Sequence, residues 1–164
     1  MANQKITDYA AITGANVDAT ADLIEIVDFS ALTNKKILVN ELGKVIGTQG
    51  TFTATLTGCT TSPTVTAAFS ITNNVVTLDI PPVTATSNTT ACTITGLPAS
   101  IAPTSGKFFS ANTIDNGTQT MSGCSIAAGA QTIVLTNGTS PSSIFTASGT
   151  KGLNQALSIS YTLS

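Results

Sequence analysis

The sequence predicts an all-β protein in which a short N-terminal β-rich anchor precedes a β-sandwich of the jelly-roll type. Composition is the first observation: from Thr48 to the C-terminus, Thr and Ser supply 42 of 117 positions, and Thr suits a pleated, half-exposed surface. Short segments that alternate apolar and polar residues are the second, and they recur at intervals of roughly 10–15 residues. The third is frequent Gly, Pro and Asn, which interrupt the chain too often for long helices.

Charge divides the chain into two parts. Charged residues make up 9% of the 164 residues, against roughly 25% in a typical soluble domain. Ten of the 14 charged side chains precede residue 45 and carry the whole net charge of −2. The four that follow are Asp79, Lys107, Asp115 and Lys151. This asymmetry predicts an attachment segment at the front of the chain and a display domain behind it.

Residues 1–46 contain short elements that cannot form a core alone. One helical turn is expected at 6–12, and strands are expected at 22–27 and 35–39, joined by a loop. Both faces of the first strand are largely apolar, because Ile24 and Ile26 alternate with other apolar side chains. A lone two-stranded unit cannot bury such faces, so the segment is predicted to dock on something else.

Residues 47–50 are predicted to be a Gly-containing linker, and residues 51–164 the β-sandwich domain. The Asn73-Asn74 pair between two apolar runs indicates a tight hairpin, and Asn-Gly pairs mark two further turns. Strands are predicted at 52–57, 65–71, 75–80, 91–97, 107–114, 122–128, 132–136 and 156–163.

The residue types argue against catalysis. The chain has no histidine, so the usual Ser or Cys triads are excluded. A carboxylate pair would have to come from Asp79 and Asp115 in the display domain. Asp79 lies in a predicted strand and Asp115 precedes an Asn-Gly turn, where aspartate serves the backbone. We therefore expect no enzyme, no catalytic residue and no cofactor.

The three cysteines, Cys59, Cys92 and Cys124, are expected to be small buried apolar residues. Their spacing fits no zinc motif, and an odd number cannot be fully paired within one chain. One disulfide, or a thiol facing a neighbouring subunit, is the alternative. With no histidine, metal binding is not expected.

Two adjacent aromatic residues, Phe108 and Phe109, fall in a predicted strand. Successive side chains of a strand point to opposite faces, so one ring should be buried and the other exposed or at a subunit contact. A role in stacking on sugars is the alternative for the exposed ring.

The chain lacks the features of several other protein classes. There is no basic stripe, which argues against nucleic-acid binding. No apolar run reaches the ~18 residues of a membrane span, and the N-terminus lacks the apolar segment of a signal peptide. We expect synthesis in a cytoplasm without export or membrane insertion.

Both ends of the chain resemble those of tailed-bacteriophage fibre and minor virion proteins. The N-terminal match comprises KITD (5–8), ADLIEIVD (21–28) and KKILV (35–39). The C-terminal segment 145–164 is similar to the last strands of β-sandwich heads in such proteins, which close on a pattern matched here by Tyr161 and Leu163.

The resemblance implies a virion structural protein that forms a homo-oligomer, typically a trimer, and fastens to the particle through its N-terminal segment. The implied neighbours are a tail adaptor, a portal-proximal protein or a capsid protein, and the outer domain would contact the host surface, including its glycans. No long shaft separates the two parts here, so a short tail or head fibre is expected. The predicted anchoring and oligomer contacts are Leu23, Ile24, Glu25, Ile26, Val27, Asp28, Lys35, Lys36, Ile37 and Val39.

Two alternatives to the fibre remain. One is a capsid-decorating cement protein, which would be present in hundreds of copies per particle. The other is a module that binds host glycans through polar, charge-poor loops, which suit ligands rich in hydroxyl groups.

Overall fold

The computed structural model describes residues 23–28, 33–38 and 47–164. The chain divides into two compact units, Met1–Ile46 and Gly47–Ser164. We call the second unit the β-body.

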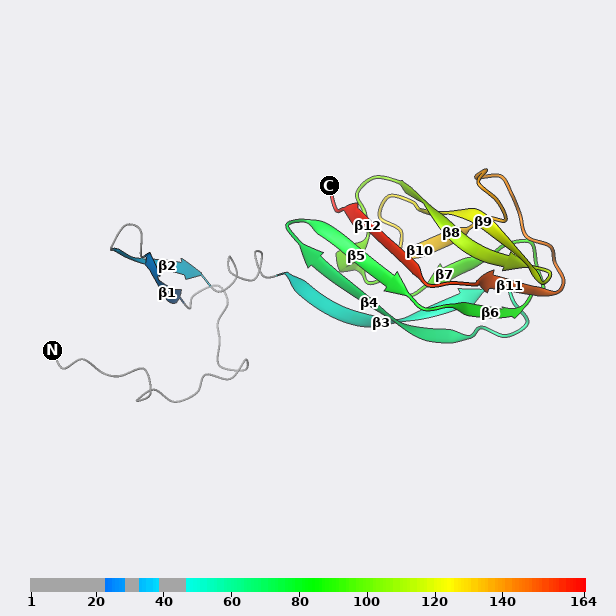
Figure 1. Ribbon diagram of the computed structural model, residues 1–164, viewed down its shortest axis with the longest axis horizontal. Coiled ribbons are helices and arrows are strands. Elements are labelled where there is room, and N and C mark those ends of the chain that lie inside the picture. The colour runs from blue at the N-terminus through cyan, green and yellow to red at the C-terminus, as the bar shows by residue number, and fades with distance from the viewer. Residues whose placement is uncertain (1–22, 29–32, 39–46) are drawn as a thin grey trace. The chain divides into compact units, whose positions relative to one another are not determined.

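An antiparallel hairpin is the described part of the first unit (Figure 1). It pairs β1 (Leu23–Asp28) with β2 (Thr33–Leu38), and its register places Glu25 opposite Lys36. The two strands overlap those predicted at 22–27 and 35–39. The helical turn predicted at 6–12 and residue Val39 lie outside the described residues.

The β-body contains ten strands and one 3₁₀ turn, which confirms the all-β prediction. They are β3 (Thr48–Thr57), β4 (Thr64–Thr72), β5 (Val75–Ile80), β6 (Val83–Thr86), β7 (Thr93–Thr95), η3 (Ala99–Ile101), β8 (Lys107–Asp115), β9 (Thr118–Ile126), β10 (Thr132–Leu135), β11 (Thr150–Leu153) and β12 (Leu157–Thr162).

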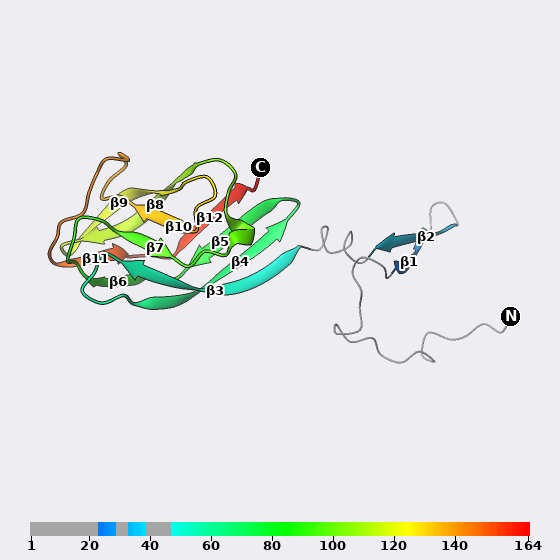
Figure 2. The same cartoon turned by 180° about the vertical axis from the view of Figure 1, so that it is seen from behind.

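All ten strands form one antiparallel sheet in the order β12-β5-β4-β3-β7-β10-β9-β8-β11-β6. The sheet curls on itself, so that β3, β4 and β5 lie on one side of the β-body and β8, β9 and β10 on the other (Figures 1 and 2). A bridge between Cys59 and Ser87 fastens the chain after β6 to the chain after β3. Next to it, the amide of Thr60 donates to the carbonyl of Thr86 at 2.9 Å.

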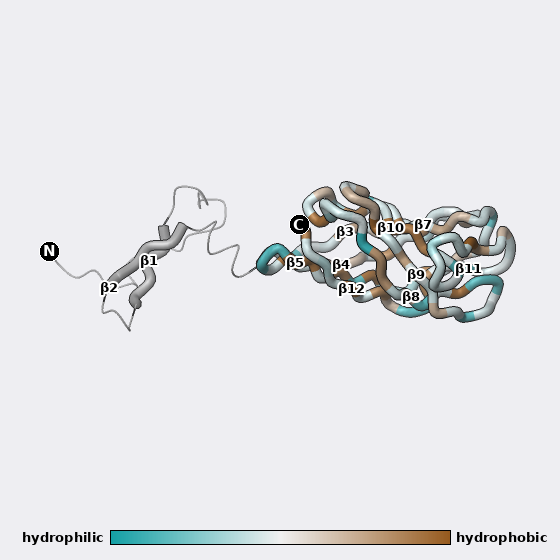
Figure 3. Tube along the Cα trace, turned by 90° about the horizontal axis from the view of Figure 1, so that it is seen from above, coloured by the Kyte–Doolittle hydropathy of each residue, from teal (hydrophilic) through white to brown (hydrophobic). Residues whose placement is uncertain are grey.

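Alternation along each strand builds the core between these two sides. In β5 the side chains of Val76, Leu78 and Ile80 are fully buried, while the residues between them are exposed. Buried and exposed residues also alternate in β12, which begins on a buried residue; Leu157 and Tyr161 are among its buried side chains. Figure 3 shows hydrophobic positions recurring along the strands in this way. The burial of apolar surface, which contributes about 25 cal/mol per Å², is the main term that stabilises such a core.

The predicted turn residues adopt the expected backbone. Asn73 and Asn74 have φ values of 49° and 65° between β4 and β5, as a tight hairpin with positive φ at both central positions requires. Asn116 and Gly117, between β8 and β9, have φ values of 48° and 82°. These two turns confirm the hairpins predicted from the Asn pairs.

Four features of the β-body differ from the sequence prediction. Most of the predicted linker at 47–50 belongs to β3, because Thr48–Gly50 pair with β4. The strand predicted at 91–97 is confined to β7, since Gly96 follows with φ 101°. Strands β6 and β11 are absent from the prediction: β6 directly follows two prolines, and β11 contains Lys151 and Gly152, which resemble turn residues.

Candidate functional site

The predicted anchoring residues lie on the N-terminal hairpin. Six of them form β1, and Lys35, Lys36 and Ile37 lie in β2; Val39 falls outside the described residues. The register sets Glu25 against Lys36 and Ile26 against Lys35. The hairpin thus places one acidic and one basic residue at facing positions, an arrangement that favours antiparallel pairing in general. Its role in anchoring stays a prediction.

The four charged residues of the β-body fall into two kinds. Asp115 and Lys151 are buried, and they face each other in the register of β8 and β11. Asp79 and Lys107 lie nearer the surface, and each shares a hydrogen bond with a side chain of β12. The first pair is considered first, because buried charges are costly unless they are fully hydrogen-bonded.

Asp115 holds the loop that follows β10. Its carboxylate accepts hydrogen bonds from the Thr146 amide at 3.1 Å and from the Thr146 hydroxyl at 2.9 Å. The side-chain amide of Asn137 donates to it at 2.8 Å. The carboxylate therefore fixes the two ends of the segment 137–146 to the end of β8. Asp115 thus supports a distant loop, whereas the sequence predicted a role in its own Asn-Gly turn.

Lys151 is the fully buried charged residue of β11, at 0% exposure. Its Nζ donates to the carbonyls of Thr89 and Ala91, each at 2.6 Å. The same Nζ lies 6.0 Å from the centroid of the Phe145 ring, within cation–π range. Lys151 thus ties the segment between β6 and β7 to the sheet, and its ammonium is committed to these contacts.

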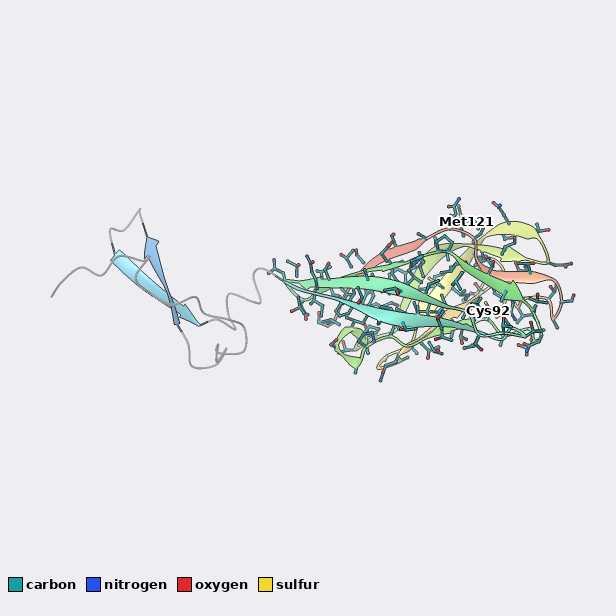
Figure 4. The ribbon with its side chains drawn as sticks, turned by 90° about the horizontal axis from the view of Figure 1, so that it is seen from below. Cys92 and Met121 are labelled. Atoms are coloured by element: carbon teal, nitrogen blue, oxygen red, sulfur yellow. The ribbon has the colours of Figure 1, made fainter. Side chains whose placement is uncertain are left out.

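All three cysteines are buried free thiols, as predicted. Burial raises the pKa of Cys92 and of Cys124 to about 12, and it also raises the pKa of Cys59. Figure 4 labels Cys92 inside the β-body. Thiols of this kind are poor nucleophiles, because the thiolate is the reactive form.

Phe108 and Phe109 lie on opposite faces of β8, as predicted. The Phe108 ring is 50% exposed and covers Gly123, where an added Cβ would lie 2.3 Å from the ring. The Phe109 ring faces inward and packs on Tyr161, with 5.9 Å between centroids. The Phe108 ring therefore lies against the sheet over a glycine and exposes about half of its surface.

A groove lies between β8 and β12 on the surface of the β-body. It has a volume of about 230 Å³. Ser110, Ala111, Asn112 and Met121 line one side, and Ala156, Leu157 and Ser158 line the other. We call this feature the β8–β12 groove.

The groove exists because two neighbouring antiparallel segments separate in the middle. At one end the Asn154 amide donates to the Asn112 carbonyl at 3.0 Å. At the other end Thr104 donates its amide and its hydroxyl to the Leu163 carbonyl, at 3.3 and 2.8 Å. Between these points β8 and β12 are not ladder partners, since β12 pairs with β5 and this part of β8 pairs with β9.

Side-chain contacts continue from the groove along β12. Ser158 donates to the Asp79 carboxylate, and the side-chain amide of Asn112 donates to Gln155 at 2.9 Å. Lys107 reaches Thr162 at 3.4 Å, near the closed end of the gap. The groove therefore has a polar rim of hydroxyl, amide and carboxylate groups.

Sequence reasoning does not find the groove. Its two sides are 43 residues apart at the Asn112–Gln155 contact, and each strand alone shows only ordinary alternation. A second hollow, of about 260 Å³, lies on the outer face of β3, β4 and β5 near Phe69, but that surface is a continuous hydrogen-bonded sheet.

Among the described residues there is no group of three or more His, Cys, Asp or Glu side chains that is able to hold a metal ion. The described part of the chain also contains no helix long and apolar enough to cross a membrane.

The fold and the groove together describe an all-β domain made of one curled antiparallel sheet, with two buried charged residues and a polar surface groove. Among solved structures, the chain is similar to a reovirus attachment protein, sigma1, determined in complex with alpha-2,3-sialyllactose. The TM-score is 0.47 at 15% sequence identity, over 97% of this chain and 84% of that one. No protein-family model matches the chain, and no curated protein does.

Proposed function

We propose that the chain is a non-enzymatic structural protein of a tailed-bacteriophage virion, namely a short tail or head fibre. Residues 1–46 attach it to the particle, and the β-body is displayed outward, where it contacts the host surface. The observation that carries the proposal is the division into two compact units at Ile46 and Gly47, which coincides with the change in charge along the sequence. The family resemblance at both ends of the chain supports the same assignment.

Attachment is assigned to the β1–β2 hairpin. Its strands carry the apolar residues that a two-stranded unit cannot bury alone, with Glu25 and Lys36 as register partners. In the proposed assembly these faces are covered by sister chains of a trimer and by a neighbouring tail adaptor, portal-proximal or capsid protein. The charged residues set register and partner choice more than affinity.

The absence of enzymatic activity is part of the proposal, and the carboxylates support it. Asp115 is held by Thr146 and Asn137, so it is committed to structure. Asp79 accepts from Ser158 on the neighbouring strand. General acid–base catalysis needs a group poised to exchange a proton with a substrate. Asp115 is buried and fully engaged, and Asp79 is an exposed carboxylate whose hydrogen-bond partner is a serine.

Purified virions test this function. Mass spectrometry and gold labelling with an antibody against the β-body should find the protein on the tail or head of the particle. Deletion of residues 1–46 should abolish incorporation while the remaining chain keeps its β-type circular dichroism. Incorporation of the truncated chain would contradict the anchor, and absence of the full chain from virions would contradict the function.

Copy number separates the fibre from the cement alternative. A few dozen copies or fewer per particle are expected for a tail or head fibre. Hundreds of copies distributed over the capsid would instead favour decoration of the shell.

A further inference from the structure

We propose that the β8–β12 groove binds a neutral mono- or disaccharide. This inference rests on the proposed display function, because it names the ligand and the site through which the β-body contacts a host surface. Four properties of the groove carry it: two facing strand edges, hydroxyl and amide side chains, an exposed thioether, and the local charge.

Facing strand edges supply backbone hydrogen-bonding groups. β12 is the terminal strand of the sheet order, and its ladder partner is β5. The register of β11 with β8 covers only Thr113–Asp115 of β8. The edges of Ser110–Asn112 and of Ala156–Ser158 therefore face each other across the groove without pairing as a ladder, although the Asn112 carbonyl already accepts from the Asn154 amide. Backbone N–H and C=O groups on such edges bind whatever polar partner is offered.

Side chains around the groove add donors and acceptors suited to hydroxyl groups. Ser110 presents a hydroxyl from the β8 side, and a serine hydroxyl both donates and accepts. On the β12 side the Ser158 hydroxyl donates to Asp79, which leaves its oxygen as an acceptor. The Asn112 amide is oriented by its hydrogen bond to Gln155, which leaves its carbonyl oxygen as an acceptor. Sugar hydroxyls also donate and accept, so they match this set without a charged partner.

Met121 provides an apolar wall beside these polar groups. It pairs with Asn112 across β8 and β9 and is 67% exposed, and Figure 4 shows it at the surface of the β-body. A thioether side chain is flexible and polarizable, so it is able to pack on the C–H face of a pyranose ring. Ligand sites generally combine apolar lining with a few placed polar groups.

The dimensions favour a small sugar over a peptide. The open part spans three residues on each strand, which is about 10 Å at the rise of an extended chain. An added β-strand is normally about 5–6 residues long, which is about twice the length of the stretch that lines the groove. One or two pyranose rings match that length. The volume of about 230 Å³ lies below the ~300 Å³ lower bound of drug-sized pockets.

Charge at the rim favours a neutral ligand. Ser158, which lines the groove, donates to the carboxylate of Asp79, so a negative charge lies next to the site. Lys107 contacts Thr162 instead, and Lys151 is fully buried. An acidic sugar would be repelled by Asp79, and neither of these lysines faces the groove to compensate.

The test uses the full chain and ligand-observed NMR with glucose, galactose, N-acetylglucosamine, rhamnose, lactose and maltose, and with α-2,3-sialyllactose as the anionic comparator. At least one neutral sugar should bind with a Kd of about 1 mM, and sialyllactose should bind more weakly than lactose. Ser110→Tyr, which fills the groove from an exposed position, should weaken binding at least about tenfold, a change that corresponds to ~1.4 kcal/mol. Thr66→Tyr, at an exposed position of β4 away from the groove, should leave binding unchanged.

Three results would overturn the proposal. They are no binding of any neutral sugar, equal binding by the Ser110→Tyr and wild-type chains, and stronger binding of sialyllactose than of lactose. If Ser110→Tyr instead disrupts self-association in sedimentation velocity while no sugar binds, the groove is a contact between copies. Asp79→Asn tests the charge argument separately, since it should bring sialyllactose binding closer to that of lactose. The virion tests above do not depend on these outcomes, so the fibre assignment and the sugar site fail independently.

Discussion

Asp115 and Lys151 face each other across β8 and β11, yet each binds a different loop. Asp115 holds Thr146 and Asn137, and Lys151 holds the carbonyls of Thr89 and Ala91. The two buried charges of the β-body thus fasten two long connections to one pair of strands. Charge is scarce in this part of the chain, and half of it is used for structure.

Removal of the Lys151 ammonium should be costly. Lys151→Ala leaves the carbonyls of Thr89 and Ala91 without their donor and creates a cavity next to Phe145. We expect the free energy of unfolding to fall by about 3 kcal/mol or more, measured by urea denaturation. The matched control is Lys107→Ala, whose exposed contact with Thr162 should be worth about 1 kcal/mol or less. Equal effects of the two substitutions would contradict the structural role of Lys151.

Asp115 and Lys151 should be energetically coupled. Asp115→Asn removes a negative charge opposite Lys151, and Lys151→Met removes the positive one. The double variant should be more stable than the sum of the single effects predicts, by about 1 kcal/mol, because neighbouring sites of one buried network are not additive. Asp79→Asn with Lys107→Met provides the control cycle, where additivity within about 0.5 kcal/mol is expected. Additivity at 115 and 151 would show that the register pairing carries no interaction energy.

Alkaline pH should unfold the β-body through its buried thiols. Burial raises the pKa of Cys92 and Cys124 from 9.0 to about 12, and that of Tyr161 from 10.0 to about 12. Above pH 9 the unfolded chain releases thiol protons that the folded chain retains, so the stability from these groups is present below pH 9 and is lost as pH rises toward 12. Between pH 8 and pH 10 each of the two thiols should lower the free energy of unfolding by about 1.4 kcal/mol.

Urea denaturation at pH 8 and pH 10 measures this loss. Cys92→Ala with Cys124→Ala should flatten the pH dependence, even if the double variant is less stable at pH 8. If the free energy of unfolding falls equally between pH 8 and pH 10 in the variant and in the wild-type chain, groups other than these thiols cause the loss of stability.

Gly152 should tolerate no side chain. Its φ is 137°, and an added Cβ would lie 2.2 Å from the Val83 carbonyl oxygen and 3.0 Å from Leu56. Gly152→Ala should therefore destabilise the β-body by about 3 kcal/mol. Gly129→Ala is the control, since that glycine also has positive φ (69°) but has nothing within 4 Å of the added carbon; it should cost about 1 kcal/mol. Thermal melts of the two variants separate crowding from backbone strain.

Strands β5 and β11 illustrate what the sequence can and cannot predict. The prediction of β5 matches its observed bounds, because its alternation and the Asn73-Asn74 turn are local signals. The prediction omits β11, because Lys151 and Gly152 are typical of a turn until the distant carbonyls at Thr89 and Ala91 are known. The β8–β12 groove escapes prediction for the same reason. It arises where two strands with an ordinary alternating pattern lie side by side without pairing. The local sequence of neither strand indicates that arrangement.

The register of the N-terminal hairpin gives a final prediction about attachment. Glu25 and Lys36 are facing positions of β1 and β2, and like charges directly opposite each other destabilise an antiparallel pair. Glu25→Lys should therefore lower incorporation of the protein into virions, and so should Lys36→Glu. The double variant, which restores opposite charges in swapped positions, should recover incorporation if register alone matters. If incorporation is low in both single variants and also in the double variant, the two charged residues instead contact a neighbouring virion protein directly. Quantitative mass spectrometry of purified particles measures all four chains, and unchanged incorporation in both single variants would remove the hairpin from the attachment mechanism.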